Sequence, residues 1–98
     1  MNNTDNNTRY YGVAIKGHMT HDEALRELIN SKNKTLAITR PEWLGLHYVE
    51  SSGEYCILLR SGKIQLATAP ESVWDTDKND WMLVECTDEA LKLMMNRR

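Results

Sequence analysis

The sequence contains no phenylalanine, so its aromatic rings come from three tryptophans, four tyrosines and three histidines in 98 residues. It also contains no apolar run that approaches the roughly 20 residues needed to span a membrane. Neither sign of charge dominates, because 12 basic residues face 14 acidic ones. A broad basic face for nucleic acid polymers is therefore not expected. The 41% share of hydrophobic residues is typical of an ordinary globular domain.

Cysteine is scarce, and Cys56 and Cys86 stand alone in apolar, strand-like segments. Two isolated thiols of this kind indicate reduced core residues rather than a disulfide framework. The first ten residues, MNNTDNNTRY, are polar and lack the apolar segment of a signal peptide. We therefore expect a cytoplasmic protein without a membrane segment, with residues 1–8 as a disordered tail and residues 9–98 as a single domain.

Two segments have the pattern of capped helices. In MTHDEALRELINSKNK, Thr20 and Glu23 stand at the spacing of a capping box. The apolar stripe that this spacing predicts consists of Leu25, Leu28 and Ile29, with Ala24 beside it. Near the end of the chain, Thr87 precedes two acidic residues, which is typical of a second helix start.

The remaining ordered segments are short and rich in β-formers: RYYGVAIKG, TLAIT, LHYVE, EYCILLR, KIQLATA and WMLVE. Turn residues such as Ser61 and Gly62 join several of them directly, as in hairpins. The order β-α-β-β-β-β-β-α predicts an α+β fold, a small antiparallel sheet with one helix in the N-terminal half and one at the C-terminus. YCILL and WMLV are apolar at alternate and intervening positions, so each is either central in the sheet or covered by another subunit. Because the chain is short, we expect a homo-oligomer.

The polar residues do not form a catalytic or metal-binding motif. His18, His21 and His47 lack partners at metal-ligand spacing, and we expect them to face solvent. Asp75, Asp77 and Asn79 begin a calcium-loop pattern, but an aspartate stands where that pattern requires glycine. We therefore expect no metal, no cofactor and no enzyme activity. A nucleotide hydrolase that uses His47 and aspartates is the enzyme alternative.

The segment PESVWDTDKNDW places Trp74 and Trp81 on either side of a run of polar residues. Arg40, Trp43 and Tyr48 flank another predicted turn. Indole rings beside arginine and aspartate suit a nucleotide, because the ring stacks on a base and arginine pairs with phosphate. The simpler interpretation is that all three tryptophans anchor the core, and it stays open here.

The segments DEALRELINSKN, TLAITRPEW and AP…D…DW, followed by MLVE, form a series of motifs over residues 20–86. The series resembles a family of small phage and prophage domains that includes the Thoeris anti-defence 2 proteins. Members of that family read like GEALELLKEGK, then Arg-x-Gly-Trp-Asn-Gly, then PS…DLLAxDW. The matching positions are Glu23, Ala24, Leu25, Leu28, Arg40, Trp43, Gly45, Pro70, Asp75, Asp80 and Trp81. Two departures lie in the turn, where Glu42 replaces a glycine and Leu44 replaces an asparagine.

The resemblance implies that the chain is a phage sponge protein. Such proteins bind a cyclic ADP-ribose immune signal, or in some relatives another cyclic nucleotide, and hold it without cleavage in the host cytoplasm. It also implies a compact α+β unit that forms dimers or tetramers with ligand pockets between subunits. The residues expected to contact the ligand are Arg40, Trp43, Tyr48, Trp74, Asp75 and Asp80.

Within this interpretation, Arg40 is expected to meet a phosphate, and Asp75 a hydroxyl or amino group. Trp74 falls at an extra residue for which the family pattern gives no guide, so it contacts ligand, a partner subunit or the core. A different class of function also fits the residues. In that alternative the chain is a small inhibitor that blocks a host protein with its acidic loop and an exposed Trp74.

Overall fold

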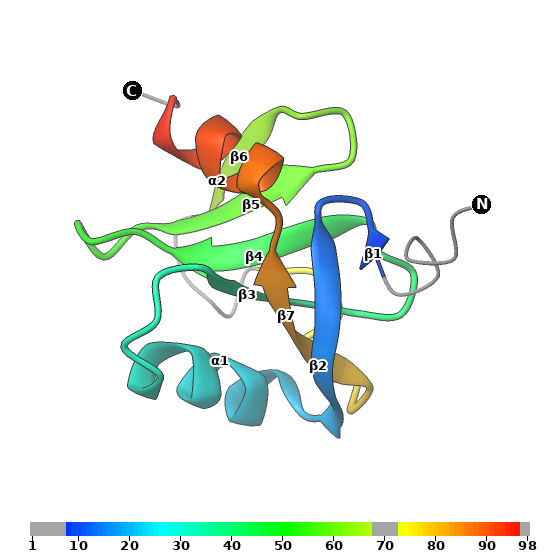
Figure 1. Cartoon of the computed structure of the whole chain (residues 1–98). Coiled ribbons are helices and arrows are strands. Elements are labelled where there is room, and N and C mark those ends of the chain that lie inside the picture. The colour runs from blue at the N-terminus through cyan, green and yellow to red at the C-terminus, as the bar shows by residue number, and fades with distance from the viewer. Residues whose placement is uncertain (1–7, 68–72, 97–98) are drawn as a thin grey trace.

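The computed structural model describes residues 8–67 and 73–96, which form one antiparallel sheet with two helices (Figure 1). The sheet has seven strands in the order β1-β2-β7-β3-β4-β5-β6. The strands are β1 (Thr8–Arg9), β2 (Gly12–Met19), β3 (Leu36–Thr39), β4 (Gly45–Val49), β5 (Tyr55–Leu59), β6 (Ile64–Ala67) and β7 (Trp81–Cys86). The helices are α1 (His21–Asn30) and α2 (Asp88–Met95). The predicted α+β class is confirmed, and β1 is the one strand that the sequence pattern did not separate.

The predicted tail, residues 1–8, lies outside the described residues except for its last position. Thr8 belongs to β1 and pairs with Val13 across a tight turn, so the predicted tail is wrong at this position. Its partner strand β2 shifts register twice against β7, between Ala14 and Lys16 and again between Lys16 and Met19. Because β1 pairs only with Gly12 and Val13 among the described residues, the rest of β2 is an open edge of the sheet, and its bulges disfavour pairing with another sheet.

Helix α1 begins with the predicted capping box. The amide of Glu23 donates to Oγ1 of Thr20 at 3.1 Å, and the amide of Thr20 donates to the Glu23 carboxylate at 2.8 Å. The predicted apolar stripe is wrong at Ile29, which is 60% exposed. His21 takes a place on the buried face instead, together with Ala24 and Leu28. In the described part of the chain, neither helix has the length and apolar character needed to cross a membrane.

Two hairpins build the middle of the sheet. The loops of residues 51–53 and 60–62 join β4 to β5 and β5 to β6, as the turn residues predicted. Each loop closes through a glycine with φ of +94°, Gly53 and Gly62. Only glycine adopts that conformation at little cost, so these two positions fix the register of the hairpins.

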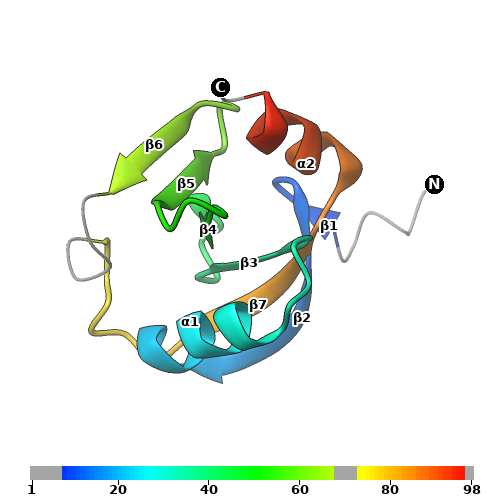
Figure 2. The ribbon, with the colours of Figure 1, turned by 90° about the vertical axis from the view of Figure 1, so that its left-hand side faces the viewer.

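Both faces of the sheet are covered within one chain. Residues of β5 alternate between two apolar clusters: Tyr55 and Ile57 face α1, while Cys56 and Leu58 face α2. The helices lie at opposite ends of the molecule, and the sheet curls between them (Figure 2). This arrangement explains why YCILL and WMLV are apolar throughout. It also removes our reason for predicting an oligomer, because a second subunit is not needed to cover these segments.

Candidate functional site

The turn after β3 places Arg40 and Glu42 side by side. The amide of Trp43 donates to the carbonyl of Arg40 at 2.9 Å, which closes a four-residue turn. Pro41 occupies its second position, where the fixed φ of proline is favoured. The buried hydroxyl of Thr39 donates to the carbonyl of Gly45 at 2.7 Å and ties the turn to β4. Both charged side chains therefore project from a rigid turn.

A second turn, which precedes β7, positions Asp75. The carbonyl of Asp75 accepts hydrogen bonds from the indole Nε1 of Trp81 at 3.1 Å and from the amide of Lys78 at 3.2 Å. Asp75 has a φ of +54°, a left-handed conformation that aspartate tolerates better than most residues. The buried indole of Trp81 thus holds the polar loop in place. This contact joins Trp81, the last residue of the segment PESVWDTDKNDW, to Asp75 in the middle of it.

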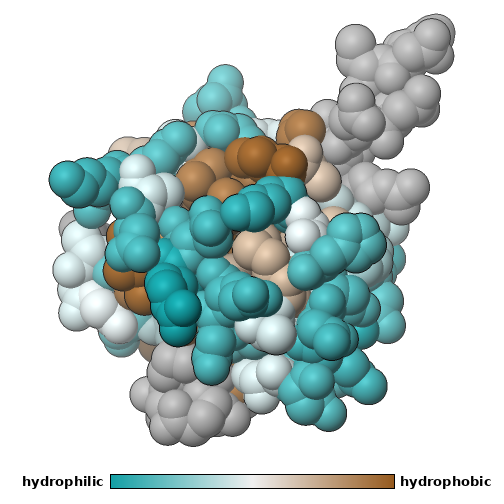
Figure 3. Space-filling model, turned by 90° about the horizontal axis from the view of Figure 1, so that it is seen from below, coloured by the Kyte–Doolittle hydropathy of each residue, from teal (hydrophilic) through white to brown (hydrophobic). Residues whose placement is uncertain are grey.

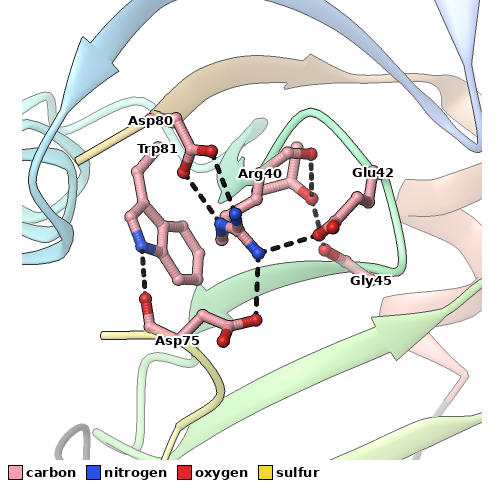
Figure 4. A network of polar contacts seen from close by, with 7 residues as sticks. Arg40, Glu42, Gly45, Asp75, Asp80 and Trp81 are labelled. Carbon is pink, nitrogen blue, oxygen red and sulfur yellow. Dashed lines mark hydrogen bonds and ion pairs between the residues drawn. The ribbon is translucent and has the colours of Figure 1, made fainter. Parts of the chain in front are cut away.

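The two turns meet in a group of charged side chains that we call the Arg40 cluster: Arg40, Glu42, Asp75 and Asp80 (Figure 4). Nε and Nη2 of Arg40 donate to the two oxygens of Asp80 at 2.8 and 2.9 Å. Nη1 donates to Glu42 at 2.8 Å and to Asp75 at 2.9 Å. The hydrogen bonds to Asp80, together with the neighbouring carboxylates, raise the pKa of Arg40. The same bonds lower the pKa of Asp80.

A shallow depression lies beside the Arg40 cluster. Its rim includes Arg40, Glu42 and Asp75, and its other walls are formed by Thr39, Leu44, Gly45, His47, Trp74 and Trp81. The space that it offers to a water molecule is only about 10 Å³, which is room for a single water. This is far smaller than a pocket that encloses a nucleotide. A larger ligand would have to be covered from outside the chain.

Aromatic rings form the floor of the depression. The ring of His47 meets Trp74 and Trp81 edge-on, with centroids 5.6 and 5.0 Å apart. His47 and Trp81 are almost completely buried, whereas Trp74 is half-buried. Trp74 therefore packs on the core and also lines the depression. Its position agrees with the core interpretation and leaves a ligand contact open.

Beneath this floor, the hydroxyl of Tyr55 lies between two histidines. It is 3.0 Å from Nδ1 of His47 and 2.9 Å from Nε2 of His21. Burial, and then the neighbouring His21, lower the pKa of His47 to about 3. Burial also lowers the pKa of His21 and raises that of Tyr55. We call these three residues the His-Tyr-His chain, in which all members are neutral at pH 7.

The predicted ligand residues separate into two groups. Arg40, Trp74 and Asp75 line the depression, and Asp80 supports Arg40 from behind. Trp43 and Tyr48 are buried in the apolar cluster on the α2 side of the sheet, 6% and 7% exposed. For Trp43 the packing interpretation therefore has the support of the structure. The depression gives no support to a ligand role for either residue.

Sequence reasoning missed the histidines of this region. The prediction that His21 and His47 face solvent is wrong, because they are 3% and 2% exposed. Only His18 is exposed, as predicted. His47 alternates with Leu46 and Tyr48, so a sheet with one wet face would place it in water. The signal that could have found it is the second helix, since two helices on one small sheet cover both faces.

The comparisons with known proteins do not extend this picture. A search of protein-family models, of curated proteins and of solved structures finds no match to the chain. The resemblance to the anti-defence family therefore rests on the short motifs alone. Among the described residues, no three His, Cys, Asp or Glu side chains gather in a way that could hold a metal ion.

Proposed function

We propose that this chain is a non-catalytic phage protein that sequesters a cyclic nucleotide immune signal in the host cytoplasm. The supporting observation is the convergence of Arg40 with Trp74 and Asp75, a pair that lies far from it in the sequence, on one aromatic-floored depression. These are residue types that recognise nucleotides, through stacking and charge-assisted hydrogen bonds. A sponge needs slow release and no chemistry, so a site of this kind suffices.

The proposal includes a second copy of the chain. The depression has room for about one water molecule, so the remaining walls around a nucleotide would come from a partner subunit in a dimer or tetramer. Leu44, 47% exposed at the rim, is an apolar side chain that a partner would cover. Light scattering across micromolar concentrations tests this part. A mass near the 11.3 kDa of one chain would contradict it.

The binding experiment is a thermal-shift screen with cyclic ADP-ribose isomers and cyclic di- and trinucleotides. A ligand at about 100 times its Kd stabilises the folded state by about 2.7 kcal/mol and raises the Tm. Heat release followed by chromatography then shows whether the ligand returns intact. Cleaved products would identify a hydrolase and contradict the sponge. Absence of any shift across the panel would contradict nucleotide binding.

Asp75→Asn and Asp77→Asn form a matched pair for this screen. Both remove one carboxylate from the same loop, but only Asp75 belongs to the Arg40 cluster. We expect Asp75→Asn to weaken binding of a confirmed ligand and Asp77→Asn to leave it unchanged. Equal effects of the two changes would place the ligand elsewhere.

The exposed Leu44 and half-buried Trp74 also favour a second candidate, an inhibitor that docks on a host protein. Such an inhibitor would show no shift with any nucleotide, so the same screen separates the two functions.

A further inference from the structure

The charge of the Arg40 cluster disagrees with the expectation that Arg40 binds phosphate. Three carboxylates contact one guanidinium, which leaves an excess of two negative charges at the rim. Four of the five N–H groups of Arg40 already donate to these carboxylates. An incoming anion would meet repulsion and few free donors.

The rim offers acceptors instead. Glu42 and Asp75 each use one carboxylate oxygen for Arg40, and the second oxygen of each has no hydrogen bond within the described residues. The two side chains are 58% and 43% exposed, so these oxygens are open to a ligand. Ionised carboxylates only accept hydrogen bonds. The rim therefore selects groups that donate.

A histidine nitrogen at the floor gives an independent indication. His47 is 98% buried and lines the depression. Its Nδ1 is occupied by Tyr55, whereas Nε2 has no hydrogen-bond partner in the described part of the chain. Nε2 is not one of the fully enclosed side-chain atoms, so it is open to a ligand atom that enters the depression and donates to it. Trp74 and Trp81 also line the depression, and the faces of indole rings attract positive charge.

We propose that the depression is a subsite for a small N–H donor, best a primary ammonium group, that bonds Nε2 of His47 and the free oxygens of Glu42 and Asp75. An ammonium group is close to water in size, which matches the room in the depression. A quaternary ammonium group is too large for it. This inference depends on the depression alone and not on the identity of the sequestered signal. For a nucleotide, an amino group of the base would enter, and the phosphates would lie outside.

The His-Tyr-His chain determines which nitrogen of His47 carries the proton when the subsite is occupied. The Tyr55 hydroxyl donates one hydrogen bond and accepts another, so the chain has two directions. In the first, Nδ1–H of His47 donates to Tyr55, which donates to Nε2 of His21, and Nε2 of His47 keeps a free lone pair. In the second, the direction is reversed and Nε2 of His47 carries the proton. A bound ammonium group selects the first direction, whereas a bound anion selects the second.

The test is a side-chain NMR titration of the full chain, labelled with ¹⁵N at histidine and tryptophan. Butylammonium chloride and sodium phosphate are added separately at pH 7.5, with sodium chloride at equal ionic strength as the reference. We expect butylammonium to move His47 toward the tautomer with its proton on Nδ1 and to shift the indole signal of Trp74. Phosphate should change neither signal. The opposite pattern, or no response to butylammonium, overturns the proposal.

A double variant, Glu42→Gln with Asp75→Asn, tests the rim. Asp80 still holds Arg40 by two hydrogen bonds in this variant, and the control is Asp77→Asn. We expect at least tenfold weaker butylammonium binding for the double variant and parental binding for the control. If the double variant binds butylammonium as tightly as the parent protein, Glu42 and Asp75 do not belong to the subsite. The titration of the parent protein decides the question even where the variant does not fold.

A separate arm compares butylammonium with tetramethylammonium, which carries charge but no N–H donor. Tetramethylammonium is expected to leave His47 unchanged. An equal response to both would reduce the site to general attraction of cations and overturn the assignment of Nε2. The nucleotide screen is independent of these titrations, so failure of the proposed function leaves this result standing, and the reverse also holds.

Discussion

Arg40 and Asp80 join the end of β3 to the start of β7 by two nearly parallel hydrogen bonds of 2.8 and 2.9 Å. Pairs with this two-point geometry restrict both side chains and are stronger than single contacts. The Arg40 side chain is 15% exposed, which limits screening by water. The pair therefore fixes the two turns that build the depression.

Loss of the Arg40–Asp80 pair should destabilise the fold more than loss of the Arg40–Asp75 pair. Asp80→Asn removes a doubly bonded partner, and we expect the free energy of unfolding to fall by about 1 kcal/mol, since Asp80 itself is partly exposed to solvent. Asp75→Asn removes a single contact and should cost less. Urea denaturation measures the free energy of unfolding of both variants. High salt should reduce the difference between their two losses. An Asp75 variant that is less stable than the Asp80 variant would contradict this order.

Tyr55→Phe should be costly although it removes a single oxygen atom. Both histidines of the His-Tyr-His chain lose their partner, and each buried nitrogen left unpaired costs roughly 1–3 kcal/mol. We expect a loss of roughly 2–4 kcal/mol in urea denaturation. Tyr10→Phe is the matched control. Tyr10 is 45% exposed, and the phenylalanine keeps the ring against which the Arg60 guanidinium packs. A Tyr55 variant as stable as this control would show that water replaces the hydroxyl.

Stability should fall in acid because the histidines of the chain are buried in the neutral form. The pKa of His47 is lowered from 6.5 to about 3, so the unfolded state binds the proton more tightly. Full stability is present above about pH 6.5 and is lost progressively toward pH 3, by about 1.4 kcal/mol per pH unit from His47 alone. His21 adds in the same direction, although Asp22 partly opposes its shift.

Urea denaturation at a series of pH values measures this slope. His18→Asn should leave it unchanged, since His18 is exposed, and asparagine tolerates the φ of +60° found there. His47→Gln should reduce the slope. If the slope survives in that variant, the acid sensitivity belongs to His21 or to Asp80, whose pKa values are also lowered.

Features that depend only on neighbouring residues were predicted correctly from the sequence. The capping box at Thr20 and the turn glycines appear where expected, because each depends on neighbours within a few residues. The burial of His47 depends on Trp74 and Trp81, which lie far along the chain on the α1 side of the sheet, and on a tyrosine from the next strand. The candidate site was predicted only in part, because its assembly also depends on long-range contacts. Arg40 and Asp75 were recognised as residue types, but their mutual pairing is a long-range contact that sequence spacing does not reveal.

Trp43→Ala should act on stability and not on a ligand directly. Trp43 is 6% exposed in the α2-side cluster, and truncation of such a ring costs about 3–5 kcal/mol. Trp74→Ala should cost less, because Trp74 is half-buried, yet it removes a wall of the depression. Urea denaturation beside the butylammonium titration separates the effects. A stable Trp43 variant with weakened binding would return Trp43 to the site.

Gly45→Ala should destabilise the fold because β4 and β5 approach each other closely at this position. A Cβ atom on Gly45 would lie 2.6 Å from Cγ2 of Ile57, and Ile57 is 1% exposed with no room to move. We expect a loss of about 1–3 kcal/mol, the usual cost of overpacking a core. Gly17→Ala is the control, since its Cβ would meet Met82 at an ordinary 3.6 Å.

A double-mutant cycle identifies the source of this loss. Ile57→Leu moves the branch point away from the strand and removes the methyl group that opposes Gly45. The single change should cost less than about 1.5 kcal/mol. In the double variant, Gly45→Ala should cost clearly less than it does alone, which gives a coupling energy of at least about 0.5 kcal/mol. If the two losses add without coupling, the glycine is required by the backbone of β4 and not by its contact with Ile57.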